Sequence, residues 1–225
     1  MKQTELVKTL DGSLTLYFEA LDEHFHSTKG AVQESMHVFI KNGFDFIEEQ
    51  RGKSNIEILE VGLGTGLNVL LTLLRHKDMR KMVSYTAIEK YPLSLDIIEQ
   101  LNYNEYVDPE IGNKLLEMHQ QSWEQWHPID EAFLLRKVNA DFCSYLPDRT
   151  YDLIYFDAFA PDKQPEMWSE TVFQRLYEHL NDQGVCVTYS AKGMIKRRLK
   201  SVGFIVETRP GPPGKREMIR ALKSS

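Results

Sequence analysis

The stretch that decides the fold runs from residue 55 to residue 68 and reads Asn-Ile-Glu-Ile-Leu-Glu-Val-Gly-Leu-Gly-Thr-Gly-Leu-Asn. Its first seven residues, 55–61, have the β-rich composition of a buried strand, and 67–75 carries leucines at the spacing of a helix. The three glycines between them allow a tight turn, and the helix N-terminus offers unpaired N–H groups to a ligand. The spacing is G-x-G-x-G, not the G-x-G-x-x-G of dinucleotide sites, and no Gly-Lys-Ser/Thr follows, which excludes a P-loop.

Strand and helix patterns alternate beyond this turn. Further strands are predicted over 83–88, 133–138, 151–156, 185–188 and 204–207, and helices over 92–101, 169–180 and 194–202. This order is typical of an α/β protein with a doubly wound, mostly parallel sheet that binds its ligand at the carboxyl ends of the strands.

Two segments fall outside the alternation and are predicted to be elaborations of one domain. Residues 1–50 contain a hairpin signal at Asp11-Gly12 and a helix through Ile40, and we expect them on the substrate side. Residues 102–130 are too long for a simple connection and form an insertion. The predicted organisation is therefore an N-terminal elaboration, 1–50, followed by a ligand-binding domain, 51–225.

Composition narrows the class of protein. The chain has 225 residues, 42% hydrophobic and 27% charged, which excludes a disordered protein. The apolar run Val69–Leu74 is far shorter than the about 20 residues of a membrane span. Glu5 and Asp11 argue against a signal peptide, so a cytoplasmic protein is expected. Two cysteines exclude a disulfide framework, and His24 and His26 lack a third partner, so no metal site is predicted.

The charge of the chain is uneven. The net formal charge is −6, yet residues 191–225 hold ten Lys or Arg against two acids, a local charge of +8. Such asymmetry indicates that this end meets a polyanion; a solvated cationic face is the alternative.

Acidic residues mark the ends of the first three strands of the domain. Glu60 precedes the glycines and suits a cationic amine, such as the amino-acid end of S-adenosylmethionine. Glu89 is placed to accept two ribose hydroxyls, and Asp141 to accept from an adenine amino group. The glycine turn and the acids at the strand ends together favour S-adenosylmethionine as the ligand. The alternative is that Glu89 and Asp141 only cap helices.

A second motif follows the strand predicted over 151–156. It reads Asp157-Ala-Phe-Ala-Pro-Asp-Lys-Gln-Pro-Glu-Met-Trp168 and lies where an acceptor would meet the cofactor. Asp157 should be partly desolvated and face the cleft. Pro161 and Pro165 stiffen the loop, and Trp168 is expected to wall the pocket.

These residues resemble the tRNA wobble-uridine aminomethyl methyltransferases, which in some bacteria form one half of a fused bifunctional enzyme. The similar stretches are Glu60–Asn68, Asp157–Trp168, Gly214-Lys-Arg-Glu-Met218 and Gly30-Ala-Val-Gln-Glu-Ser35 with Val38-Phe39, and they span residues 24–218. The resemblance implies a Rossmann-like class I S-adenosylmethionine-dependent methyltransferase with Asp157 as its catalytic residue. The implied cofactor-binding residues are Glu60, Gly62, Gly64, Thr65, Gly66, Asn68, Glu89, Asp141 and Asp157.

The implied reaction is N-methylation of 5-aminomethyl(-2-thio)uridine at the wobble position of tRNA, giving 5-methylaminomethyl(-2-thio)uridine. The fused relatives carry a flavin oxidase domain for which this chain has no length, so we expect no flavin and only the aminomethyl substrate. The anticodon loop is the expected partner, and no membrane is expected. The substrate-binding candidates are Phe159, Pro161 and Trp168 in the pocket and Arg197, Arg198, Lys215 and Arg216 on phosphates.

The sequence leaves two roles open for Asp157. It either aims the acceptor amine and stabilises the cation that forms, or it contacts the cofactor. The alternative functions are a methyltransferase or an aminopropyltransferase, related to spermidine synthase, that acts on a small amine, and a non-catalytic RNA-binding subunit.

Overall fold

The centre of the fold is an eight-stranded sheet, and the strand that precedes the glycines is one of its inner strands. The computed structural model describes residues 4–51, 55–77 and 81–224. In this part of the chain the strand order is β10-β11-β9-β8-β4-β5-β7-β6. Five neighbouring strands are parallel: β7 (Phe133–Asn139), β5 (Met82–Glu89), β4 (Asn55–Val61), β8 (Tyr151–Phe156) and β9 (Leu180–Thr188). Antiparallel strands extend both edges: β6 (Trp126–Asp130), β11 (Glu217–Leu222) and β10 (Ile205–Pro210).

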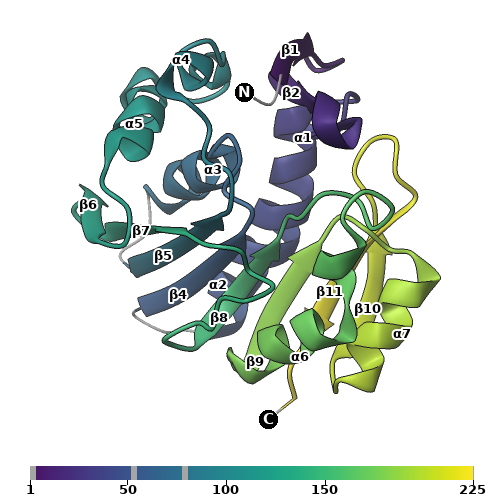
Figure 1. Cartoon of the computed structure of the whole chain (residues 1–225). Helices are drawn as coiled ribbons and strands as arrows, with labels where there is room; N and C mark the ends of the chain where they lie inside the picture. The colour runs from purple at the N-terminus through teal and green to yellow at the C-terminus, as the bar shows by residue number, and fades with distance from the viewer. Residues whose placement is uncertain (1–3, 52–54, 78–80, 225) are drawn as a thin grey trace.

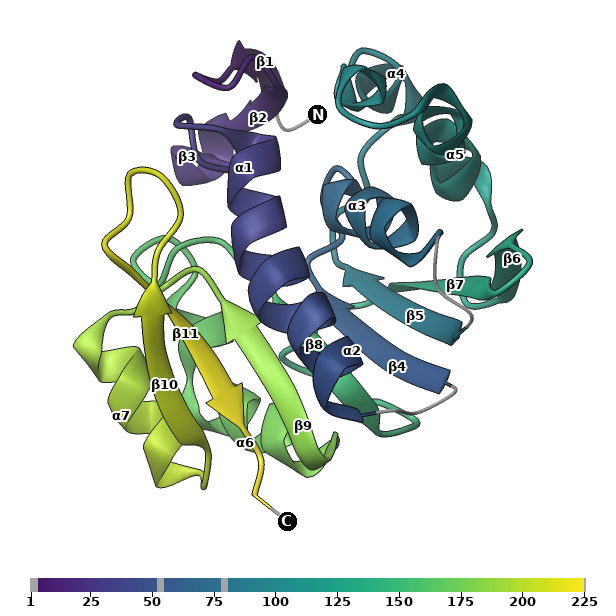
Figure 2. The same cartoon turned by 180° about the vertical axis from the view of Figure 1, so that it is seen from behind.

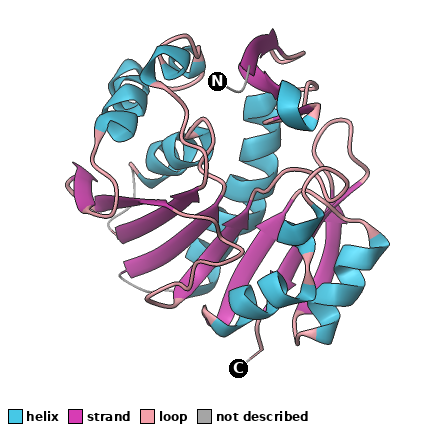
Figure 3. Cartoon of the chain, viewed as in Figure 1, coloured by secondary structure: helices cyan, strands magenta, loops and turns pink. Residues whose placement is uncertain are grey.

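Helices cover both faces of this sheet, as Figures 1 and 3 show. One face carries α6 (Glu170–Glu178) and α7 (Gly193–Ser201). The other carries α3 (Leu67–His76) and a long helical rod made of α1 (Ala31–Ser35), η2 (Met36–Phe44) and α2 (Asp45–Arg51), seen in Figure 2. An apolar cluster lies on each face, because the central strands bury side chains on both sides.

The rod contacts the sheet through a wide π-helical stretch, η2. A Cβ built on Gly43 in this stretch would lie 3.1 Å from Tyr155 Cε1 and 3.1 Å from Val187 Cγ2. A larger residue here would force these side chains to shift, so the glycine favours the close approach of the helix to β8 and β9. The domain boundary predicted at residue 50 lies in the last turn of α2, and the rod of the N-terminal segment belongs to the core.

Smaller elements gather at the carboxyl ends of the parallel strands (Figure 1). Two 3₁₀ turns and two helices come from the middle of the chain: η3 (Tyr103–Glu105), η4 (Pro165–Trp168), α4 (Leu95–Ile98) and α5 (Pro109–Gln120). The N-terminal segment adds β1 (Thr4–Lys8), β2 (Leu14–Phe18), η1 (Glu19–Leu21) and β3 (Glu23–His24). β1 and β2 form the hairpin predicted at Asp11-Gly12.

The predicted α/β architecture is confirmed, with differences in several elements. The helix predicted over 92–101 is only the turn α4, because Gln100 N and Leu101 N donate to carbonyls three residues back and tighten the chain. β9 begins at Leu180 and not at 185, and a register shift against β8 absorbs the extra residues.

β6, β11 and α5 were not predicted. The start of α5 could have been predicted from the sequence, since Asp108 caps the helix and Pro109 is its first residue. Within the described ranges, no helix is both long and apolar enough to cross a membrane.

Candidate active site

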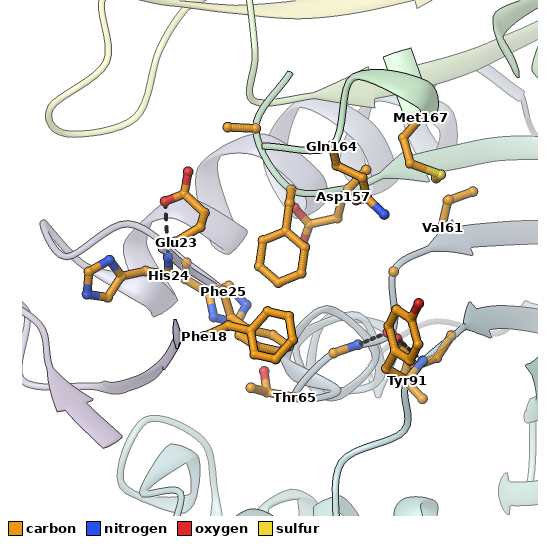
Figure 4. A pocket seen from close by; sticks show the side chains of 18 of the residues that line it. Phe18, Glu23, His24, Phe25, Val61, Thr65, Tyr91, Asp157, Gln164 and Met167 are labelled. Carbon is orange, nitrogen blue, oxygen red and sulfur yellow. Dashed lines mark hydrogen bonds between the residues drawn. The ribbon is translucent and has the colours of Figure 1, made fainter. Parts of the chain in front are cut away.

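A cavity of about 370 Å³ opens at the carboxyl ends of the parallel strands. Its walls come from the glycine turn after β4, the ends of β5, β7 and β8, the N-terminal segment and the loop between β10 and β11. Figure 4 shows side chains from the strand ends and from the N-terminal segment converging on it. A volume of this size is in the range of cofactor pockets.

The glycine turn has the conformation that its sequence predicts. Gly62 has φ +96°, and both Gly62 N and Leu63 N donate to Ile88 O on β5, at 2.9 and 3.1 Å. A Cβ on Gly62 would lie 2.6 Å from Asp157 O, and one on Gly64 (φ +51°) would lie 3.0 Å from Phe25 Cδ1. Side chains are therefore excluded here by both backbone conformation and space.

Glu89 is braced at the end of β5. Its Oε1 accepts from Tyr91 N at 2.8 Å and its Oε2 accepts from Gly64 N at 3.0 Å. Each carboxylate oxygen keeps a second acceptor site. The carboxylate is thus fixed in orientation while it lines the cavity.

Asp141, after β7, also lines the cavity and pairs with Lys90 at 2.7 Å. The Lys90 ammonium lowers the pKa of this carboxyl, and Cys143 N donates to its Oδ1 at 2.9 Å. Asp141 is therefore ionised at neutral pH.

Glu60 lies beneath the turn and is fully buried. Asn68 Nδ2 donates to Glu60 Oε1 at 2.9 Å and to Asp157 Oδ2 at 3.0 Å, so one amide links the two carboxyls. Burial raises the pKa of Glu60 well above its ordinary value. The predicted contact of Glu60 with a cationic amine is corrected: inside β4 its side chain points to a face of the sheet, and Glu60, Gly66 and Asn68 do not line the cavity.

Asp157 lies at the carboxyl end of β8 and lines the cavity, half-buried. Burial raises the pKa of Asp157 to about 7; the neighbouring Glu34 carboxylate adds to this, whereas the Asn68 hydrogen bond opposes it. A carboxyl in this position changes charge near neutral pH.

Phe159 lines the cavity, but Trp168 does not, which corrects the prediction that Trp168 walls the pocket. Trp168 is 0% exposed, and its ring meets Phe156 edge-on at 5.0 Å. Its Nε1 donates to Phe159 O at 2.7 Å, so it supports the loop from below. Pro161 is buried as well and is not in the wall. The 3₁₀ turn η4 directs the indole into the apolar layer under the loop.

Aromatic side chains of the N-terminal segment complete the wall. The Phe159 ring lies 6.0 Å from that of Phe18 and 5.1 Å from that of Phe25. Lys163 and Asp22 pair at 3.0 Å across the same junction. Sequence reasoning assigned no role to these residues, since only the folded chain brings residues 18–25 over residue 159.

The insertion, 102–130, holds the glycine turn from behind. Tyr103 Oη donates to Thr65 Oγ1 at 3.1 Å, and His119 Nε2 donates to Thr65 O at 3.1 Å. Burial lowers the pKa of His119 to about 4, so its ring is neutral. Tyr106 Oη also donates to Asp11 O at 3.0 Å in the hairpin. The insertion therefore contacts both the turn and the N-terminal segment.

The four predicted phosphate contacts separate into two groups. Arg197 and Arg216 are exposed. Arg198 Nη1 instead donates to Trp168 O at 2.8 Å, and Lys215 lines the cavity and pairs with Glu34. Arg198 and Lys215 are thus engaged within the protein, and the contact of all four residues with RNA phosphates stays a prediction.

No group of three or more His, Cys, Asp or Glu in the described part of the chain is arranged to hold a metal ion. His24 and His26 both line the cavity; His26 is buried, and that burial lowers its pKa to about 4.

Residues 109–224, just over half of the chain, match the sequence model of a family described as S-adenosyl-L-methionine-dependent methyltransferase. The chain belongs to this family. The methyltransferase is 33% identical to the tRNA 5-methylaminomethyl-2-thiouridine biosynthesis bifunctional protein MnmC of Leptospira interrogans, and 30% identical to the protein of that name from Cupriavidus metallidurans. The matches cover 94% and 97% of the chain, and the chain spans about a third of each relative's length (34%).

Solved structures agree with these relatives. The crystal structure of MnmC2 from Aquifex aeolicus matches with a TM-score of 0.82 at 26% identity, over 100% of this chain and 72% of that one. The spermidine synthase of Thermotoga maritima matches over 100% of this chain and 70% of that one with a TM-score of 0.64 at 14% identity, a similarity of fold. The class I methyltransferase fold and the resemblance to the methyltransferase half of the bifunctional enzymes are confirmed.

Proposed function

We propose that this methyltransferase N-methylates 5-aminomethyl(-2-thio)uridine at the wobble position of tRNA, giving 5-methylaminomethyl(-2-thio)uridine. The observation that carries the proposal is the position of Asp157 and Phe159. Both lie on the wall of the cavity onto which the glycine turn also opens. The relatives named for 5-methylaminomethyl-2-thiouridine biosynthesis support the same acceptor.

The residues at the strand ends fit the cofactor of the family. Glu89 offers two oriented oxygens to a pair of ribose hydroxyls, and ionised Asp141 offers an acceptor to an adenine amino group. Residues 62–65 of the glycine turn line the cavity, and its two glycines there put no side chain between the backbone and a ligand. S-adenosylmethionine, when bound, supplies a methyl group activated on a sulfonium. No flavin and no metal are part of the proposal.

Asp157 receives the acceptor amine in this mechanism. A primary alkylamine with a lysine-like pKa of about 10.4 needs about 4 kcal/mol to lose its proton at pH 7. The apolar wall around Phe159 favours the neutral amine, and Asp157 aims it. The secondary ammonium that methylation of the neutral amine forms would then pass one proton to Asp157 or to water. Alignment and exclusion of water account for most of the rate.

Exposed cations would position the tRNA. Arg197 and Arg216 lie at the surface of the C-terminal cationic segment, where they suit phosphates of an anticodon loop whose wobble base is turned into the cavity. We also propose the cytoplasm as the compartment, since a tRNA acceptor would be met there.

The first experiment is nucleoside mass spectrometry of aminomethyl-bearing tRNA after incubation with the protein and S-adenosylmethionine. A gain of one methyl on the wobble nucleoside is expected. No gain, with S-adenosylmethionine still bound, would overturn the tRNA acceptor and direct the search to polyamines and other small amines. Asp157→Asn is expected to bind the cofactor and fail to methylate; a loss of cofactor affinity would assign Asp157 to the cofactor instead.

A further inference from the structure

A second carboxylate, Glu34 on α1, lies in the wall of the cavity. It is 5% exposed, and its Oε2 accepts from Ser27 N at 2.7 Å. Its Oε1 accepts from Lys215 Nζ in an ion pair that joins residues 181 positions apart. Buried carboxylates are held by such partners because an unpaired charge is costly to bury.

Lys215 belongs to the same cavity and comes from the loop between β10 and β11. Its Nζ lies 3.8 Å from the centroid of the Tyr189 ring, and the Tyr189 hydroxyl donates to Ala158 O at 2.9 Å, next to Asp157. Lys215 N donates to Pro212 O at 2.9 Å, which fixes the backbone of the loop. The flexible side chain of Lys215 is therefore the part that has freedom to move.

Asp157 is the other carboxylate on which Lys215 acts. Lys215 lowers the pKa of Asp157 electrostatically, against the larger upward effect of burial. Three further carboxylates line the cavity and already have partners: Glu89 is held by backbone amides, Asp141 by Lys90, and Glu23 by the backbone amide of His24. If Glu34 did not hold it, Lys215 would find its next partner in Asp157.

We propose that Glu34 is a positioning residue that keeps the Lys215 ammonium on the cavity wall and so leaves Asp157 free for the acceptor amine. An ammonium on Asp157 would neutralise the carboxylate and occupy the place of the cationic acceptor. This inference rests on the proposed function, because it assumes an amine acceptor at Asp157. Glu34 then acts on substrate binding through Lys215 and needs no contact with the substrate.

The test is a double-mutant series with methylation kinetics on aminomethyl-bearing tRNA. Glu34→Gln keeps the shape of the side chain and removes its charge. We expect it to raise the KM for tRNA by about tenfold or more, a coupling typical of contacting charged residues. The affinity for S-adenosylmethionine, measured by calorimetry, should stay within about twofold, and kcat should change less than KM.

Removing the released cation should reverse the defect. Glu34→Gln with Lys215→Met is expected to lower the KM at least about fivefold from that of Glu34→Gln alone, since neighbouring charges are not additive. The matched control combines Glu34→Gln with Lys200→Met, which removes an exposed cation of α7 and should rescue nothing. Should Glu34→Gln fail to fold, Glu34→Asp, with its carboxylate drawn back from Lys215, replaces it and should show the same rescue.

Three results would overturn the proposal: a KM unchanged in Glu34→Gln, a double variant no better than Glu34→Gln, or a tenfold loss of cofactor affinity, which would place the pair in the cofactor site. A wild-type protein that methylates no tRNA would refute the proposed function separately. The movement of Lys215 from Glu34 to Asp157 can also be followed without an acceptor. The measured quantity is the fall in melting temperature with rising pH as Asp157 ionises. That fall should shrink in Glu34→Gln and return in the double variant.

The charged and titratable groups that face Asp157 in this readout come from five elements. They are Glu34 on α1, Glu60 on β4 behind Asn68, Tyr85 on β5, Tyr189 after β9, and Lys215 on the loop before β11. Burial raises the pKa values of Glu60, Tyr85 and Tyr189 well above their ordinary values, and all three residues are the same in every variant compared. Because Glu34 itself raises the pKa of Asp157, the effect of Lys215 is read from the comparison of Glu34→Gln with the double variant, which both lack Glu34.

Discussion

Trp168→Phe tests whether the acceptor loop depends on a support that lies outside the cavity. The indole Nε1 donates to Phe159 O at 2.7 Å, and phenylalanine has no donor for this bond. Loss of the hydrogen bond costs about 1 kcal/mol. The smaller ring leaves about 40 Å³ of space in a fully buried site, worth about 1 kcal/mol more at about 24 cal/mol per Å³. The expected loss is therefore about 2 kcal/mol of unfolding free energy.

Thermal and urea unfolding followed by circular dichroism would measure this loss. For a chain of this length, 2 kcal/mol corresponds to a fall in Tm of about 4–8 °C. The carbonyl of Phe159 also loses its anchor, and because the Phe159 ring lines the cavity, the KM for tRNA should rise while cofactor affinity stays near that of the wild type.

Trp126→Phe is the matched control. Trp126 lies on the edge strand β6, half-buried, with Arg149 stacked 4.6 Å from its ring centroid. Its substitution should cost less than about 1 kcal/mol and leave the KM unchanged. Equal losses of stability and equal KM values in the two variants would refute the assignment of Trp168 as the support of the loop.

Three further predictions concern the cofactor side, the acid and the RNA surface. Because burial raises the pKa of Asp157 to about 7, the folded protein binds its proton more tightly than the unfolded chain, and stability is lost as pH rises from about 4 to about 7. Asp157→Asn should remove this loss, so the melting temperature of the variant should fall less over that pH range. If the melting temperatures of the variant and the wild type change in parallel with pH, the raised pKa of Asp157 is contradicted. Tyr103→Phe removes the hydrogen bond to Thr65 and should weaken S-adenosylmethionine binding about tenfold in calorimetry, with the KM for tRNA unchanged. An unaltered Kd for S-adenosylmethionine would be evidence against Tyr103 as a support of the glycine turn. Arg197→Glu with Arg216→Glu should lower tRNA affinity at least tenfold and flatten its salt dependence in filter binding; equal affinity would remove both residues from the RNA surface.

The strand–turn–helix of residues 55–76 and the acids at the strand ends were predictable from the sequence. The reason is that these features are local. Glycines at φ +96°, +51° and +77° are a property of five consecutive residues, and the periods of strands and helices are visible over short windows. A strand end in a parallel sheet also identifies the edge where Glu89, Asp141 and Asp157 meet, whatever the details of packing.

Tertiary structure alone decided which of these residues face the cavity. Glu60 and Trp168 stand in the two motifs that indicated function, yet both side chains are buried beneath it, because strand alternation and the 3₁₀ turn point them into the apolar layers. The ion pair between Glu34 and Lys215 joins the N-terminal segment to the C-terminal part of the chain. It depends on the order and register of β9, β10 and β11 beside α1, and no local pattern of residues encodes that arrangement.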